Sequence, residues 1–177
     1  MEWKGVQECT FSESMILARN ATKEPKLLST HYKIIHNIWP TKEKFLQWRI
    51  ENNPDCHCIE RDTIIHSLCV CTYTQTFLED AFQYLDRNNA FQQTLHFENF
   101  IFGVKDNAWN MILLVLKWYI VTSRLKTYRL NIEAFRLHLM NRIVAEKHIT
   151  QNYKFQEKWQ GFEWLIEERE AYFNQFI

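Results

Sequence analysis

Four of the five cysteines of this chain lie between residues 56 and 71, in the segment CHCIERDTIIHSLCVC. Read as metal ligands, three of them and one histidine form the pattern C-x-C-x7-H-x4-C. The predicted ligands are Cys56, Cys58, His66 and Cys71. Three thiolates and one imidazole complete the tetrahedral shell that zinc prefers, and a shell filled by four protein ligands is structural, not catalytic. The pattern therefore predicts one structural zinc ion.

The close spacing of the first two cysteines makes a geometric demand on this loop. In an extended chain the Cα atoms of residues i and i+2 lie about 6.6 Å apart. Zinc–sulfur bonds of about 2.3 Å require sulfur atoms about 3.8 Å apart, so the side chains of Cys56 and Cys58 must converge. Cys69 remains as a spare thiol and His57 as a second possible nitrogen donor. The alternative interpretation is a group of reduced, partly buried cysteines without a metal.

The segments around the cysteines are expected to be helices. The chain holds only 3 Gly and 3 Pro, while 46% of its residues are hydrophobic, which favours a packed helical core over a sheet with many tight turns. Pro25 suits the first turn of a helix that carries apolar residues as far as Trp39 and ends at Pro40. Thr41 is a suitable N-cap for a short second helix. These two helices predict a helix–turn–helix immediately before the cysteine loop.

Helical spacing returns beyond the cysteines. One helix is predicted from Tyr73 to Tyr84, closed by Asn88-Asn89, and residues 96–104 are expected to form a short strand or an extended linker ending at Gly103. Three further helices are expected at 109–120, 132–143 and 155–166. The first of these is apolar almost all round, as is typical of the central helix of a bundle.

The predicted fold is therefore mainly α: a helical bundle with a small Cys/His zinc-knuckle loop inserted after a helix–turn–helix. Two regions are expected. Residues 1–90 hold the helix–turn–helix and the Cys/His loop, and residues 91–177 form a C-terminal helical region that packs on it.

Charged residues are unevenly distributed, although 21 basic side chains balance 21 acidic ones. Residues 23–49 carry six basic and two acidic side chains, residues 50–106 carry three basic and nine acidic ones, and residues 107–147 are basic again. Such segments can form separate faces, one of them suited to a polyanion. The alternative is that they are ordinary solvated helix faces.

Several motifs resemble the C-terminal region of the reverse-transcriptase polyprotein of LINE-type (non-LTR) retrotransposons. They are KIIHNIWPTKEKF, the cysteine cluster, TYTQTFLEDAFQYL, FENFIFGV and MILLVLKWYIVTSRLK, in this order. The resemblance implies a non-catalytic region that follows the polymerase, binds zinc through the four ligands above and helps to hold template RNA or target DNA. The chain departs from the family's pattern at the first cysteine pair, where the family usually has two or three intervening residues, and at Asn37, where an Arg often follows the helix His.

The candidate nucleic-acid contacts lie just before the cysteine loop. They are Lys33, Lys42, Lys44 and Arg49 for phosphates, with His36 and Trp48 as stacking groups. We expect weak, non-specific binding of RNA or DNA, and an upstream polymerase domain as partner if the chain belongs to a longer polyprotein. The chain has no Asp-Asp pair for polymerase metals, so no enzymatic activity is expected. The rival hypotheses are a domesticated helical protein-interaction module and an inactive retrotransposon relic.

No membrane segment is predicted. The N-terminus lacks the apolar region of a secretory signal, and the longest apolar run, Trp109 to Val121, is shorter than the ~20 residues that a membrane span requires. The expected location is intracellular, cytoplasmic and/or nuclear.

Overall fold

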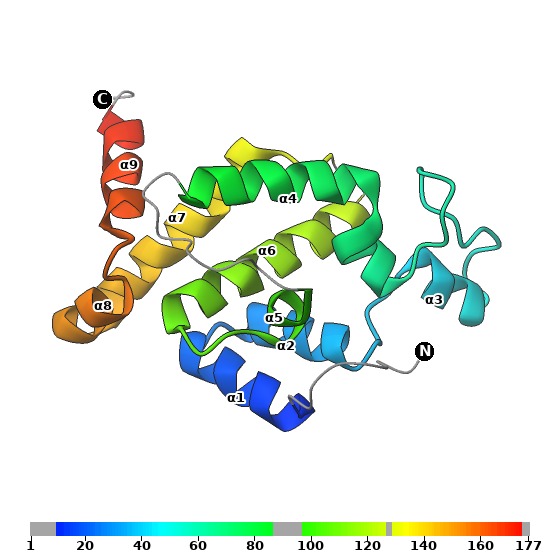
Figure 1. Cartoon of the computed structure of the whole chain (residues 1–177), viewed down its shortest axis with the longest axis horizontal. Coiled ribbons are helices and arrows are strands. Elements are labelled where there is room, and N and C mark those ends of the chain that lie inside the picture. Colours follow the sequence, from blue (N-terminus) through cyan, green and yellow to red (C-terminus); the bar gives the residue numbers. More distant parts are fainter. Residues whose placement is uncertain (1–9, 87–96, 127–128, 175–177) are drawn as a thin grey trace. The chain divides into compact units, whose positions relative to one another are not determined.

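The computed structural model describes residues 10–86, 97–126 and 129–174 (Figure 1). Throughout these residues the regular structure is helical, which confirms the mainly α prediction. The elements are α1 (Phe11–Ala21), α2 (Pro25–Ile35), α3 (Lys42–Gln47), the π-helix η1 (His66–Val70), α4 (Thr72–Leu85), α5 (Phe97–Phe102), α6 (Asn107–Leu125), α7 (Ile132–Ile149), α8 (Asn152–Lys158) and α9 (Glu163–Asn174). None of these helices is both long enough and apolar enough to cross a membrane.

The chain divides into two compact units. The first comprises Met1–Glu79 and Thr94–Leu130, and the second comprises Asp80–Gln93 and Asn131–Ile177. The first unit therefore holds the cysteine loop and α1, α2, α3, α5 and α6, and the second holds α7, α8 and α9. The boundary expected between residues 90 and 91 falls outside the described residues and stays a prediction.

Helix α6 forms the core of the first unit, and α1, α2 and η1 pack against it (Figure 1). Its residues are buried on all sides, from Ala108 to Ser123, because apolar side chains surround the helix with no continuous polar face. The prediction of a central apolar helix is confirmed. Lys117 is fully buried in this helix, although it belongs to the basic segment 107–147 of the sequence.

Helix α1 was not predicted, although its start has a clear signal. The Thr10 side chain accepts a hydrogen bond from the Glu13 N–H at 3.2 Å, and the Glu13 carboxylate accepts one from the Thr10 N–H at 2.8 Å. This reciprocal pair is a capping box, readable as Thr-x-x-Glu. The helix buries Ser14, Ala18 and Ala21, and this sparse apolar stripe explains why periodicity alone missed it.

The helix–turn–helix before the cysteine loop is formed by α2 and α3, but α2 ends at Ile35 and not at Pro40. Asn37 adopts a left-handed conformation with φ of 53°, and the Ile38 N–H donates to the Lys33 carbonyl at 2.8 Å. This is a Schellman motif, which stops the helix before the proline is reached. Thr41 caps α3 as predicted, because its hydroxyl accepts a hydrogen bond from the Lys44 N–H at 3.3 Å.

Residues 96–104 were expected to be a strand or linker, but Phe97–Phe102 form helix α5. Three consecutive buried residues, Phe100 to Phe102, give a run that fits a strand or a helix equally well. The helix ends at Gly103, whose φ is +101° and where an added Cβ would lie 2.6 Å from the Asn110 side chain. The conformation therefore favours glycine here, and a larger residue would also have to displace the Asn110 side chain.

In the second unit, the single helix expected over 155–166 is broken into α8 and α9. Gly161 has φ of +87°, and the Phe162 N–H donates to the Trp159 carbonyl at 2.9 Å, so the chain turns between the two helices. Phe155, Trp159, Phe162 and Leu165 are buried. The predicted closure of α4 at Asn88-Asn89 lies outside the described residues.

Candidate metal centre

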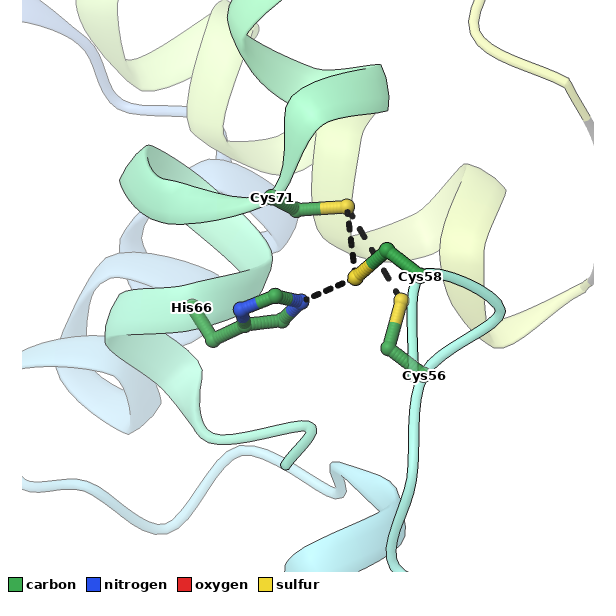
Figure 2. Close-up of side chains that lie close together, drawn as sticks. All are labelled: Cys56, Cys58, His66 and Cys71. Carbon is green, nitrogen blue, oxygen red and sulfur yellow. Dashed lines mark hydrogen bonds between the residues drawn. The ribbon is translucent and has the colours of Figure 1, made fainter. Parts of the chain in front are cut away.

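The four predicted ligands converge at one point of the first unit (Figure 2). Their ligand atoms all lie within 4.8 Å of one another. The Cys71 sulfur lies 3.8 Å from that of Cys56 and 3.9 Å from that of Cys58. These separations match the ~3.8 Å edge of a tetrahedron built on zinc–sulfur bonds. The fourth ligand atom, His66 Nε2, lies 3.1 Å from the Cys58 sulfur. The donor set is therefore compatible with zinc in kind, number and spacing.

A tight turn brings Cys56 and Cys58 together. The Ile59 N–H donates to the Cys56 carbonyl at 3.0 Å, and the Cys56 N–H donates to the Glu60 carbonyl at 2.8 Å. Ile59 has φ of 73°, a left-handed conformation that is rare for a β-branched residue. The chain is thus curled, not extended, between the two cysteines, and this is how a C-x-C pair meets the geometric demand of a shared metal.

The π-helix η1 positions the other two ligands. In an α-helix, residues five apart point about 140° away from each other. Here the Cys71 N–H donates to the carbonyl of His66 at 2.8 Å, so one wider turn separates the two residues. Both side chains consequently point toward Cys58 (Figure 2). The Thr63 hydroxyl accepts a hydrogen bond from the His66 N–H at 3.1 Å and holds the start of this turn.

A further cation contacts the sulfur cluster and was not predicted. Arg124 of α6 donates through one terminal nitrogen to the Cys71 sulfur at 3.2 Å and through the other to the Cys56 sulfur at 3.1 Å. The second nitrogen also donates to Asp62 at 2.8 Å. In the sequence Arg124 belongs to the basic segment 107–147, one of the segments that can form a face suited to a polyanion. Nothing in the local sequence links it to cysteines more than fifty residues away, because only the tertiary fold brings them together.

The electrostatics of the cluster are uneven. Burial would raise the pKa of the Cys71 thiol, but hydrogen bonds, chiefly from Arg124, outweigh it and hold this pKa below its usual value. At Cys56 burial again acts to raise the pKa of the thiol. Hydrogen bonds from the Cys58 backbone, His66 and Arg124 outweigh it, so this pKa is also lowered. The pKa of Cys58 is raised, by burial first and by the neighbouring cysteines. Two of the three thiols are therefore already biased toward the thiolate form that binds metal.

The spare donors stand apart from this group. Cys69 is not among the clustered ligands, and burial raises the pKa of its thiol to about 12, which keeps it protonated and a poor ligand at neutral pH. His57 is exposed to solvent and likewise lies outside the cluster. With four protein ligands around the shared centre, a bound ion has no open position for a substrate.

The six candidate nucleic-acid residues lie on α2 and α3 or within two residues of their C-terminal ends, and they differ in accessibility. Lys33, His36 and Arg49 are exposed, and Trp48 keeps 49% of its surface accessible. The Lys42 ammonium is half-buried and donates to the Asp55 carbonyl at 2.9 Å. Lys44 is half-buried too.

The exposed ring of His36 belongs to an aromatic row that the sequence did not indicate. It stacks on Phe11 at a centroid distance of 5.0 Å and lies 4.3 Å from the Tyr32 ring. Phe11 and Tyr32 are themselves 43% and 46% exposed, so part of this row faces solvent.

Comparison with models of protein families, with curated protein sequences and with solved structures found no match to this chain. The resemblance to retrotransposon polyproteins remains a prediction from the sequence.

Proposed function

We propose that this chain is a zinc-stabilised helical module, without catalytic activity of its own, that holds single-stranded RNA or DNA weakly through α2 and α3. The observation that carries the proposal is the closed Cys3His cluster directly after a helix–turn–helix with exposed cations and rings. The zinc ion stabilises a loop that lacks a hydrophobic core of its own, and the neighbouring helices contact the nucleic acid.

The zinc part of the proposal is supported by the donor set. Cys56, Cys58, His66 and Cys71 offer four ligand atoms within 4.8 Å of one another, and a shell completed by protein stabilises a fold without activating water. Structural zinc of this kind contributes on the order of 10 kcal/mol to folding in small domains.

The nucleic-acid part is supported by the accessible side chains of α2 and the α3 cap. Lys33 and Arg49 are exposed cations suited to phosphate contact. The aromatic row of Phe11, His36 and Tyr32 and the half-exposed Trp48 ring offer surfaces on which unpaired bases stack. Lys42 contributes less, because its ammonium already holds the loop at Asp55.

Fluorescence anisotropy with a labelled single-stranded oligoribonucleotide tests this function. We expect dissociation constants on the order of 10⁻⁴ to 10⁻⁶ M at physiological salt, with little dependence on base sequence. The double variant Lys33→Glu, Arg49→Glu removes two phosphate contacts. The fall of log K with log salt should therefore become shallower, its slope losing about two units of magnitude.

The matched control is Lys147→Glu, Lys154→Glu, the same charge change on exposed lysines of the second unit, which should bind as the wild type does. Equal affinity of both double variants would remove α2 and α3 as the site. Absence of wild-type binding even at low salt would refute nucleic-acid binding altogether.

A second candidate function, docking of a protein, is favoured by exposed apolar side chains around the metal loop. Ile59 is 87% exposed, Ile50 64% and Val70 53%, and exposed apolar side chains of this kind can be buried against a partner protein. A largely apolar protein interface would respond little to salt, whereas phosphate contacts make log K fall steeply with log salt. The salt titration therefore separates the two functions.

A further inference from the structure

Arg124 of α6 donates hydrogen bonds to two of the three sulfurs of the cluster at once. Its two terminal nitrogens lie 3.2 Å from the sulfur of Cys71 and 3.1 Å from that of Cys56. A planar guanidinium has rigidly forked donors, so this double contact fixes the separation of the two sulfurs, 3.8 Å. That separation is the one that a tetrahedral zinc ion requires.

Asp62 anchors the guanidinium in this orientation. Its Oδ1 accepts from Arg124 at 2.8 Å and from the Ser67 hydroxyl at 2.6 Å, and its Oδ2 accepts from the Lys42 N–H at 3.1 Å. Hydrogen bonds from Ser67, Lys42 and Arg124 outweigh burial and hold the pKa of Asp62 below its usual value. The carboxylate therefore stays ionised and links α3, η1 and α6 at the metal loop.

We propose that Arg124, held by Asp62, is a positioning residue of the metal centre that sets the spacing and the charge of the cysteine ligands. Zinc with three thiolates and a neutral imidazole carries a net charge of −1. The guanidinium, 18% exposed, places its positive charge against two of these thiolates, and the ionised Asp62 that holds it keeps the whole group at −1. Its N–H groups also draw electron density from two sulfurs, as donors around a metal site do. This inference rests on the zinc part of the proposed function.

Metal affinity of the full chain tests the proposal. Zinc dissociation constants are measured by competition with a chromophoric chelator for the wild type, Arg124→Met, Arg124→Lys and Asp62→Asn. We expect Arg124→Met to weaken zinc binding about 10- to 100-fold, the usual cost of losing an outer partner of a metal ligand. Arg124→Lys keeps the positive charge but loses the paired N–H donors of the guanidinium. Its zinc affinity should lie between those of the wild type and Arg124→Met. The matched control Arg129→Met removes an exposed arginine and should bind as tightly as the wild type.

The absorption spectrum of the cobalt-substituted protein gives a readout that general destabilisation would not move. Hydrogen bonds to thiolates lower the energy of the sulfur lone pairs, so losing them shifts the thiolate-to-cobalt charge-transfer band to longer wavelength. We expect this shift in Arg124→Met, a smaller one in Arg124→Lys, and none in Arg129→Met. If Arg124→Met does not fold, the Arg124→Lys spectrum and affinity decide.

The outcomes distinguish this inference from the proposed function. If the wild type binds neither zinc nor cobalt, the zinc part of the proposed function is wrong and the inference falls with it. If the wild type binds zinc, and the folded Arg124 variants bind it within about twofold with an unshifted cobalt band, the metal centre stands and only the role of Arg124 is overturned.

Discussion

At the scale of single residues, the sequence pointed to the four ligands but not to the groups that contact them. Cys56, Cys58, His66 and Cys71 are close enough in the chain for their spacing to identify them. Arg124 and Lys117 are different, because each sits in a long apolar helix and reaches partners far away in sequence. From the sequence alone, a charged residue in such a helix could be exposed to solvent or buried. Only the tertiary fold shows which.

Lys117 lies at one end of a buried hydrogen-bonded chain. Its ammonium nitrogen donates to the Ile101 carbonyl at 2.9 Å and lies 3.0 Å from His31 Nδ1. The hydroxyl of Ser14 donates to the Phe102 carbonyl and accepts from His31 Nε2 at 2.9 Å. Burial, with Lys117 nearby, lowers the pKa of His31 to about 2, so the imidazole is neutral and its Nδ1 accepts from Lys117.

Because burial lowers the pKa of Lys117 to about 7, stability should rise with pH in a defined window. Between about 7 and the ordinary lysine pKa near 10.5 the unfolded chain binds one proton more than the folded chain, so the free energy of unfolding increases with pH. From pH 7 to 8.5 the gain is about 1–2 kcal/mol. This range lies above the usual pKa of 6.5 for His31 and below the usual thiol pKa of 9.0 for Cys69, two titratable groups that also face Lys117.

Urea unfolding of the zinc-loaded protein at pH 7.0 and 8.5 measures the effect, with Lys117→Met as the reference that lacks the titrating group. The wild type should gain more stability than Lys117→Met over this interval. Equal gains in the two proteins would show that Lys117 is charged throughout.

Cys69 is predicted not to bind the metal, although it lies only two residues before Cys71. Its thiol is outside the cluster and its pKa is raised to about 12 by burial. A Cys69→Ser variant should keep one zinc per chain, whereas Cys71→Ser should lose it, as measured by mass spectrometry under native conditions. The reverse pattern would mean that the fourth ligand is wrongly assigned.

At the scale of elements, regular periodicity was predictable and special backbone geometry was not. The α2–α3 pair, α4 and α6 carry apolar residues at helical spacing, and the sequence indicated them. The π-helix η1 and the curled turn between Cys56 and Cys58 have no such spacing. Each is defined by particular backbone hydrogen bonds, which the pattern of apolar residues does not indicate. The prediction of a strand or linker at α5 was wrong for a related reason. An apolar run as short as this one shows no period that would distinguish a helix from a strand.

Ile59 offers a test of the curled turn. It holds φ of 73° with its side chain 87% exposed, so it bears the cost of a left-handed conformation, about 1–2 kcal/mol, with little burial in return. Asparagine tolerates this conformation well. Ile59→Asn should therefore raise the free energy of unfolding of the zinc-bound protein by about 1 kcal/mol in a urea titration.

Ile149→Asn is the matched control, because Ile149 is 84% exposed but ends the ordinary helix α7. Its stability should change by less than about 0.5 kcal/mol. A stabilised control, or a destabilised Ile59→Asn, would contradict the strained-turn account.

At the scale of the whole molecule, each of the two compact units is stabilised by contacts of its own. The first contains the metal loop, and the second contains α7, α8 and α9 with their own contacts, such as the 2.6 Å ion pair between Lys158 and Glu146. The sequence predicted helices in both units, and no linker signal in it marks the division within α4, which contributes to each unit.

Zinc removal should accordingly affect one unit only. We expect a chelator to speed amide hydrogen exchange in the loop from Asp55 to Cys71, whose backbone is held mainly by its own turn hydrogen bonds and by the metal. Exchange in α7 and α8 should stay unchanged in the same mass-spectrometric experiment. Equal acceleration in α7 would show that the metal stabilises the chain as a whole.

Metal analysis of protein purified without added zinc tests the central claim most directly. The account predicts one zinc ion per chain in the wild type and in His57→Ala, which changes an exposed histidine of the same loop, and loss of the metal in His66→Ala. A wild type with less than about a tenth of an equivalent of zinc, and with a melting curve that a chelator leaves unchanged, would contradict it.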